Sequence, residues 1–230
     1  MRFDSISGEK RLEVATNNAI LFVASNKGYN MSNLEEKVEK RLEQEGRGYV
    51  FTRKDFQDLA PAGTIGKLLF RLKKKGEIRR LCRGLFDYPR VNPALGGELS
   101  PDLDLAAKAI ARKFRWTILP FGNLAANRLG LSQQVPAQFV YLSNGPTKQS
   151  KVGNRTIHFK HARPKEIYAD SEISGLVVQA LRYLGKDHVN ENVVAHLKKN
   201  LSHEEKKELL EQIHYSAEWI YEIVQRIAKD

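Results

Sequence analysis

The residues with the clearest chemical potential in this sequence are the cations between positions 61 and 90. This stretch holds nine Lys and Arg residues against two acidic ones, in a chain whose formal net charge is +11. The basic residues are Lys67, Arg71, Lys73, Lys74, Lys75, Arg79, Arg80, Arg83 and Arg90. Positive charge focused in this way favours a polyanionic partner, most often a nucleic acid, because cations that neutralise phosphates release counterions.

The residues that could support catalysis do not form a recognisable set. Asp102 and Asp104 have the spacing of a metal-binding pair, but Pro101 makes them look like the start of a helix. Gly66-Lys67 lacks the spacing of a phosphate-binding loop, and the single cysteine, Cys82, has no general base nearby in sequence. We therefore expect a protein that is not an enzyme and that has no cofactor and no metal site.

A second group of cations lies between positions 148 and 165, with Phe159 among them. Its members are Lys148, Lys151, Arg155, Lys160, His161, Arg163 and Lys165. Lys148, Lys151, Arg155, Lys160 and Arg163 are candidates for an additional nucleic-acid contact, since cations interleaved with an aromatic residue suit that role. A solvated hairpin explains the same pattern equally well, so both interpretations stay open.

The first basic stretch needs elements that present it, and the sequence predicts them in a distinctive order. A helix starts at a Ser32 or Asn33 cap and ends near residue 42, and a strand covers 49–51. A near-match to a capping box at Thr52 and Asp55 opens a short helix to residue 59. A second helix follows over 64–75 and ends at Gly76, before β-prone runs at 78–81 and 84–88.

This order is typical of a winged helix-turn-helix, in which one helix enters the major groove and a hairpin lies along a neighbouring part of the DNA. The second helix turns an apolar face inward, with Ile65, Leu68, Leu69 and Leu72. The predicted DNA-binding residues are Thr64, Lys67, Arg71, Lys74, Arg79, Arg80 and Arg83. The alternative is a solvated helix end at 73–75 and a sheet edge that Arg79 and Arg80 protect from pairing.

Beyond a predicted linker at 93–97, the sequence indicates a mixed body with its own caps, strands and helices. Ser100-Pro101-Asp102 starts a helix to about residue 114. Further strands are expected at 117–119, 139–142 and 156–161, and further helices at 123–129, 173–184, 192–199, 204–213 and 217–227. Ser202 and Glu205 form a capping box for the fourth of these helices.

The expected fold class is therefore α+β: an N-terminal winged helix-turn-helix followed by a mixed α/β body that ends in a helical C-terminal segment. The expected domains are an N-terminal extension over 1–30, a DNA-binding domain over 31–97 and the body over 98–230. Met31 is a candidate for the native start, and the alternative is an extra helix of 1–30 packed on the head. No stretch reaches the roughly 18–20 apolar residues of a membrane span, so we expect a cytoplasmic protein.

Several runs of residues resemble AbiEi-like antitoxins of type IV toxin–antitoxin systems, which act in abortive phage infection. The runs in the head are residues 48–56 (GYVFTRKDF), 72–81 (LKKKGEIRRL) and 83–89 (RGLFDYP). The runs in the body are residues 136–143 (PAQFVYLS), Gly145-Pro146 and residues 179–185 (QALRYLG). The resemblance covers about residues 31–229, and its motifs in the head are shared by many winged helices.

The resemblance implies a DNA-binding antitoxin that represses its own operon. Its partners would be double-stranded DNA of its own promoter and a nucleotidyltransferase-like toxin, which it would oppose without needing a stable complex. The alternative is an RNA- or protein-binding modulator in which the winged helix is only an interaction module. Whether the protein forms a homodimer on DNA stays open.

Overall fold

The structure is a computed structural model that describes residues 30–167, 171–213 and 216–229. Only Asn30 of the predicted extension is among them, so the predictions for 1–29 lie outside the described residues. The described chain divides into two compact units, one of residues 30–80 and 86–99, and one of residues 81–85 and 100–229. Both contain helices and strands, which confirms the mixed α+β class. The boundary predicted at 97/98 stays a prediction.

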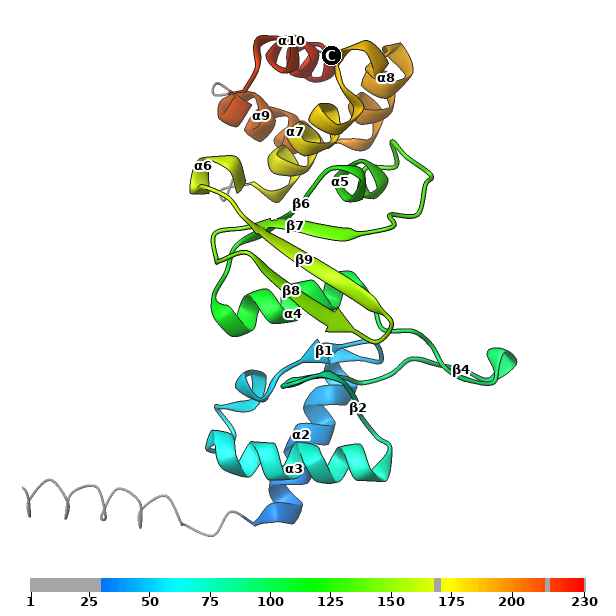
Figure 1. Cartoon of the computed structure of the whole chain (residues 1–230), viewed down its shortest axis with the longest axis vertical. Helices are drawn as coiled ribbons and strands as arrows, with labels where there is room; N and C mark the ends of the chain where they lie inside the picture. The colour runs from blue at the N-terminus through cyan, green and yellow to red at the C-terminus, as the bar shows by residue number, and fades with distance from the viewer. Residues whose placement is uncertain (1–29, 168–170, 214–215, 230) are drawn as a thin grey trace, which may run out of the picture. The chain divides into compact units, whose positions relative to one another are not determined.

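The N-terminal elements come in the predicted order up to the strand at 85–87, and the elements over 91–98 were not predicted; all are shown in blue to green in Figure 1. They are α2 (Met31–Glu45), β1 (Val50–Phe51), η1 (Arg53–Phe56), α3 (Ala62–Lys75), β2 (Arg79–Cys82), β3 (Leu85–Asp87), β4 (Val91–Asn92), η2 (Pro93–Leu95) and β5 (Gly97–Glu98). The short helix η1 ends at Phe56, three residues earlier than predicted, and the chain continues as a turn over 57–59.

The cap of α2 corrects the sequence prediction. Asn30, rather than Ser32 or Asn33, is the N-cap, and its Oδ1 accepts hydrogen bonds from the amides of Ser32 at 3.1 Å and Asn33 at 3.4 Å. Asn and Ser cap helices about equally well, so residue type alone did not distinguish Asn30 from Ser32 or Asn33 as the cap. The capping box of η1 is present as predicted, with the Thr52 amide donating to Asp55 Oδ2 at 2.7 Å.

A small hydrophobic core holds α2, η1 and α3 together. The predicted apolar faces are buried: Leu34, Val38 and Leu42 of α2 meet Ile65, Leu68, Leu69 and Leu72 of α3. Phe51 and Phe56 contribute fully buried rings whose centroids lie 5.4 Å apart in an edge-on contact. A three-stranded sheet of order β1-β3-β2 adjoins this core, with Phe51 opposite Phe86 in the antiparallel register of β1 and β3.

The segment predicted as a linker is instead a small antiparallel ribbon. β4 pairs with β5, with Val91 opposite Glu98 and Asn92 opposite Gly97, and η2 forms its tip. The Pro and Gly residues that suggested a linker are those that this tight tip needs, since Gly96 has a φ of 77°.

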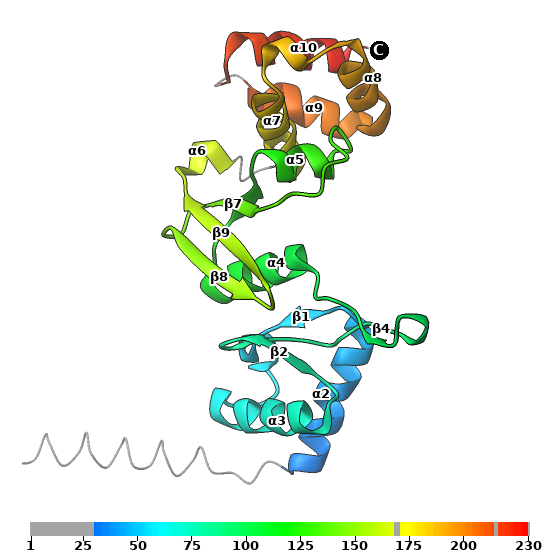
Figure 2. The same ribbon diagram turned by 45° about the vertical axis from the view of Figure 1, so that its right-hand side comes forward.

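The elements after residue 100 build a sheet and a group of helices, shown in green to red in Figures 1 and 2. They are α4 (Leu103–Phe114), β6 (Ile118–Pro120), α5 (Asn123–Arg128), β7 (Phe139–Ser143), β8 (Lys148–Val152), β9 (Arg155–His161), α6 (Pro164–Ile167), α7 (Glu172–Leu184), η3 (Lys186–His188), α8 (Glu191–Asn200), α9 (His203–Gln212) and α10 (Glu218–Ala228). Asp102 caps α4, two residues later than the predicted cap at Ser100.

The four-stranded sheet has the order β6-β7-β9-β8 and contains a strand that the sequence analysis did not predict. This strand is β8, which pairs antiparallel with β9, whereas β7 pairs with β9 in parallel. The mostly polar run 148–152 gave no strand signal, because an edge strand needs few apolar side chains. α4 lies on one side of the sheet, and α5 and α7 lie on the other (Figures 1 and 2).

The C-terminal helices α7 to α10 surround a core of their own. Val177, Val178 and Leu181 of α7 are fully buried against apolar side chains of α8, α9 and α10. The predicted capping box of α9 is present, with the Ser202 amide donating to Glu205 Oε2 at 2.8 Å. Among the described residues, no helix has the length and apolar character needed to cross a membrane.

Candidate nucleic-acid interface

The exposed face of α3 is cationic because the helix turns all of its large aliphatic side chains inward. Ile65, Leu68, Leu69 and Leu72 have exposed fractions of 0%. At 100° per residue, the opposite side of the helix carries Lys67 and Lys74, both exposed, and Thr64 lies half-buried at the flank. Lys67 and Lys74 are therefore presented to solvent in the way that the sequence suggested.

Arg71 lies at the flank of this face and is tied to α2. Its guanidinium forms an ion pair with Glu35, and Lys75 Nζ lies 2.6 Å from the other carboxylate oxygen of Glu35. The hydrogen bond from Lys75, together with the charge and hydrogen bond of Arg71, lowers the pKa of Glu35. The sequence analysis missed Glu35, because its partners lie 36 and 40 positions away along the chain and only the packing of α2 against α3 brings them together.

Arg79 is held inside the first unit rather than offered to a ligand. Its Nε and Nη2 donate to the two carboxylate oxygens of Asp87 at 3.1 and 2.6 Å. It also donates to Glu98 Oε2 at 3.1 Å and to the carbonyl of Leu99 at 3.0 Å. Because Asp87 is only 1% exposed, this guanidinium is the counter-ion of a buried carboxylate. We therefore leave Arg79 out of the set of proposed DNA contacts.

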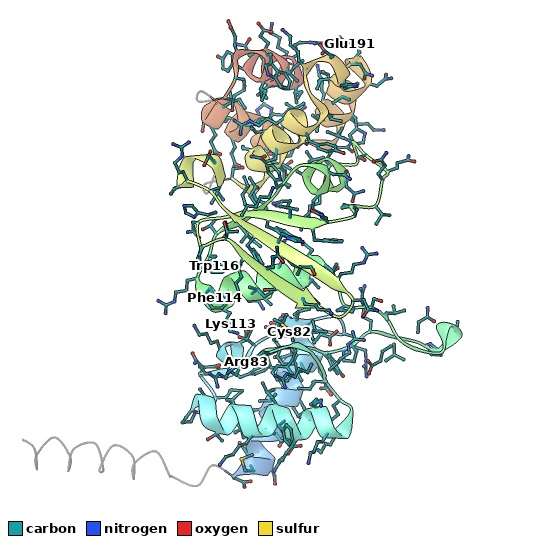
Figure 3. The ribbon with its side chains drawn as sticks, in the orientation of Figure 1. Cys82, Arg83, Lys113, Phe114, Trp116 and Glu191 are labelled. Atoms are coloured by element: carbon teal, nitrogen blue, oxygen red, sulfur yellow. The ribbon has the colours of Figure 1, made fainter. Side chains whose placement is uncertain are left out.

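The other two arginines of the predicted hairpin are exposed. Arg80 lies on β2, and Arg83 occupies the turn between β2 and β3, where Figure 3 labels it. The next residue, Gly84, has a φ of 76°, a backbone conformation that residues other than Gly rarely adopt. Arg83 belongs to the second compact unit. Both arginines stay candidates for DNA contact.

The predicted second basic tract does not form one surface. Lys148 pairs with Phe159 and Lys151 pairs with Thr156 in the register of β8 and β9, so the two lysines point to opposite sides of the sheet. Arg155 and Lys160 of β9 are also an odd number of residues apart and point to opposite sides. A single ligand cannot contact all four through one face of the sheet.

Most cations of this tract contact neighbouring protein groups. Lys148 Nζ lies 4.2 Å from the ring centroid of Phe114, and Lys160 Nζ lies 5.0 Å from that of Phe121. The Arg155 guanidinium lies 5.7 Å from the ring centroid of Phe139, and Arg163 Nε lies 3.5 Å from Glu166 Oε2. Each interaction is worth about 1 kcal/mol or less at an exposed site, so a nucleic acid could still compete for these cations.

An aromatic cluster beside α4 was not recognised from the sequence. Phe114 and Trp116, labelled in Figure 3, stack with ring centroids 4.7 Å apart and an interplanar angle of 22°. Trp116 also makes an edge-on contact with Phe159 at 5.6 Å. Arg115 between them adopts a φ of 58°, which turns the chain sharply enough to bring the two rings together. Phe114 is the last residue of α4 and Trp116 lies in the loop after it, so no single helical or strand pattern contained both residues and signalled this contact.

The two acids that resembled a metal-binding pair have protein partners instead. Asp102 accepts hydrogen bonds from the amides of Asp104 at 2.8 Å and Leu105 at 3.1 Å as the cap of α4. Asp104 accepts a hydrogen bond from the Tyr141 hydroxyl at 2.6 Å and forms an ion pair with Arg128. Within the described part of the chain, no group of three or more His, Cys, Asp or Glu residues is placed to hold a metal ion.

Three comparisons place this chain among known proteins. The model of a family of unknown function, DUF6088, matches residues 37–209. A search of curated proteins finds no match. Among solved structures, the crystal structure of the RV2827C protein from Mycobacterium tuberculosis is similar, with 14% sequence identity and a TM-score of 0.38. The matched region covers 78% of this chain and 71% of that one.

Proposed function

The chain belongs to DUF6088, a family of unknown function, and we propose that its N-terminal part is a winged helix-turn-helix that binds double-stranded DNA. The observation that carries this proposal is the outward face of α3, where Lys67 and Lys74 are exposed while the opposite face anchors the helix in the core. A helix of this kind can enter the major groove, and its cations can reach phosphates or guanine edges.

The elements around α3 support the same proposal. η1 precedes α3 across a tight connection at 57–61, as the first helix of a helix-turn-helix precedes the second. β2 and β3 follow it as neighbouring strands, and the turn between them carries Arg83, in the manner of a wing. Arg79 acts as a support in this arrangement, because it joins β2 to Asp87 of β3.

We extend the proposal to a biological role on the basis of the resemblance to AbiEi-like antitoxins. The protein would be a cytoplasmic antitoxin and autorepressor that binds its own promoter and opposes a nucleotidyltransferase-like toxin. The part after residue 97 would carry the antitoxin activity, since it has a sheet and two hydrophobic clusters of its own. A nucleotidyltransferase-like reading frame next to the gene would support this role, and its absence would count against it.

DNA binding can be tested with the full-length chain and a duplex of its own promoter between 50 and 200 mM salt. If Lys67 and Lys74 each contact a phosphate, the double variant Lys67→Ala/Lys74→Ala should reduce the slope of log affinity against log salt by about 2. The matched control is Lys199→Ala/Lys207→Ala, which removes two exposed cations from the C-terminal helices. An equal effect of both double variants would contradict a DNA contact through α3.

The second candidate function is an RNA- or protein-binding modulator. The observation in its favour is a pair of cation–aromatic contacts on one side of the sheet in the second unit, in which Lys148 lies over the Phe114 ring and Arg155 over the Phe139 ring. Rings and cations in close succession suit single-stranded RNA, whose bases can stack on aromatic side chains. Competition decides between the candidates: single-stranded RNA that displaces promoter DNA at equal nucleotide concentration would favour the second one.

A further inference from the structure

Phe70 stands out among the residues of α3 because its side chain faces solvent. It is 54% exposed, whereas Phe51 and Phe56 of the same unit are fully buried. Full burial of a Phe side chain stabilises a protein, and this position gives up much of that contribution. A single exposed apolar residue is common on protein surfaces, so exposure alone does not indicate a role.

The position of Phe70 on the outward face of α3 indicates a binding role for its exposed ring. On the helical wheel it lies close to the centre of the outward face, between Lys67 three residues before it and Lys74 four residues after it. Lys74 Nζ lies 5.0 Å from the ring centroid, so a cation flanks the ring directly. A surface that must bind a charged backbone and an apolar group at once would have this composition.

The N-terminal half of the same face is unusually open. Gly63 and Gly66 lie seven and four residues before Phe70, which places them on the same side of the helix. A Cβ atom added to either glycine would meet no heavy atom within 4 Å, so neither is required for packing inside the protein. Glycine nevertheless lowers helix stability relative to alanine. Their benefit would be close approach of a ligand to the helix, with Phe70 as the first aromatic side chain that it meets.

We propose that the Phe70 ring contacts the C5-methyl group of a thymine in the major groove and thereby reads an A·T base pair in the operator. This inference rests on the proposed function and goes beyond it by naming a residue that determines sequence preference. The thymine methyl is the apolar group that the major groove displays, and Phe is among the side chains suited to contact it. Lys67 and Lys74 on either side would contact phosphates or guanine edges and hold the ring in register.

Replacement of thymine by deoxyuridine tests the proposal, because it removes only the C5-methyl group. The full-length chain first selects its preferred duplex from a random-sequence library, and each thymine of that duplex is then replaced in turn. Loss of one buried methyl group should weaken binding about three- to fivefold at one position. Phe70→Ala should bind the thymine and deoxyuridine duplexes equally at that position, with affinity close to that of the wild type for the deoxyuridine duplex.

The controls separate this inference from the proposed function. Val91→Ala, which alters another exposed apolar residue of the first unit, should keep the preference for thymine, and circular dichroism should show that both variants fold. Specific binding with no sensitivity to any thymine methyl, or undiminished sensitivity in Phe70→Ala, would overturn the role of Phe70 and leave DNA binding intact. Failure to select any duplex would overturn the proposed function itself.

Discussion

Two arginines four residues apart, Arg79 and Arg83, illustrate how little a residue type says about its role. Arg83 is exposed at a turn, where its charge can meet a ligand. Arg79 instead forms a bidentate pair with Asp87, which is almost inaccessible to solvent. A buried carboxylate that loses its counter-ion is costly, whereas an exposed arginine can be removed with little effect on stability.

The first prediction at this scale concerns these two arginines. Arg79→Met should lower the free energy of unfolding by about 2–3 kcal/mol, because it leaves Asp87 buried without a partner. Arg83→Ala should change it by less than about 0.5 kcal/mol. Urea unfolding followed by circular dichroism measures both values. Equal stability of the two variants would show that the pair with Asp87 does not support the fold.

The second prediction concerns Glu35, whose pKa is lowered by Lys75 and Arg71 from its ordinary value of 4.5. A carboxyl group with a lowered pKa in the folded state stabilises the fold above its unfolded-state pKa, and this contribution is lost as the pH falls through the folded-state value. Glu35→Gln should therefore unfold at lower temperature than the wild type at pH 7, and the difference should shrink below about pH 4.5.

Thermal unfolding from pH 7 to pH 3 measures this difference, with Glu36→Gln as the control. Glu36 is exposed on the same helix and belongs to none of the ion pairs described above. A difference between Glu35→Gln and the wild type that grows as the pH falls would contradict the pairing. Because Glu35 also neutralises part of the α3 flank, the same variant should bind DNA more tightly at low salt.

At the scale of elements, the two ends of α3 use glycine for opposite reasons. Gly76 ends the helix with a φ of 80° and a ψ of 8°, and its amide donates to the carbonyls of Leu72 and Lys73. Gly63 lies in the first turn, where an added Cβ would meet no neighbour. Gly76 allows the left-handed backbone conformation that ends the helix, and Gly63 leaves space at the proposed DNA-binding face.

The third prediction follows from this difference. Gly76→Ala should destabilise the protein by about 1 kcal/mol, because alanine is strained in the left-handed conformation. Gly63→Ala should stabilise it by roughly 0.5–1 kcal/mol through better helix propensity, and should weaken binding to the selected duplex. Urea unfolding and a titration with DNA check the two effects. A Gly63→Ala variant that gains stability and binds DNA normally would show that the open turn has no role in binding.

At the scale of the whole molecule, each unit contains hydrophobic clusters built from its own residues. The buried residues of the cluster around α2 and α3 run from Leu34 to Ile78, and those of the two clusters around α7 run from Leu119 to Ile227. The contacts of Arg79 extend to Glu98 and Leu99, so a cut after residue 97 would remove two of its partners. Residues 30–99 are therefore a better choice for an isolated head than the predicted 31–97.

The fourth prediction uses these boundaries. Residues 30–99 alone should repress a reporter driven by the promoter, and residues 100–230 alone should rescue cells from the neighbouring toxin without repressing it. Expression of each fragment beside the toxin and the reporter measures both activities. Rescue by residues 30–99 alone would show that repression of toxin synthesis is the whole mechanism, and would contradict this division of labour.

The sequence by itself determined the elements whose signals are local. Helical periods placed Leu34, Val38 and Leu42 on one buried face, and capping residues marked the starts of η1 and α9. Gly76 marked the end of α3, and the concentration of cations pointed to the exposed side of that helix. Each of these features depends on residues within about two turns of one another, which is the range that propensity, capping and period describe.

Only the tertiary structure decided which cations are exposed to a ligand and which form ion pairs with acidic side chains of the protein. Arg79 pairs with Asp87 and Glu98, and Glu35 pairs with Arg71 and Lys75. These partners lie between 8 and 40 positions apart along the chain. The parallel pairing of β7 with β9 and the antiparallel pairing of β8 with β9 divide the second basic tract between two sides of a sheet. Such pairings depend on long-range packing and register, and a one-residue change of register would have put the same lysines on the opposite face.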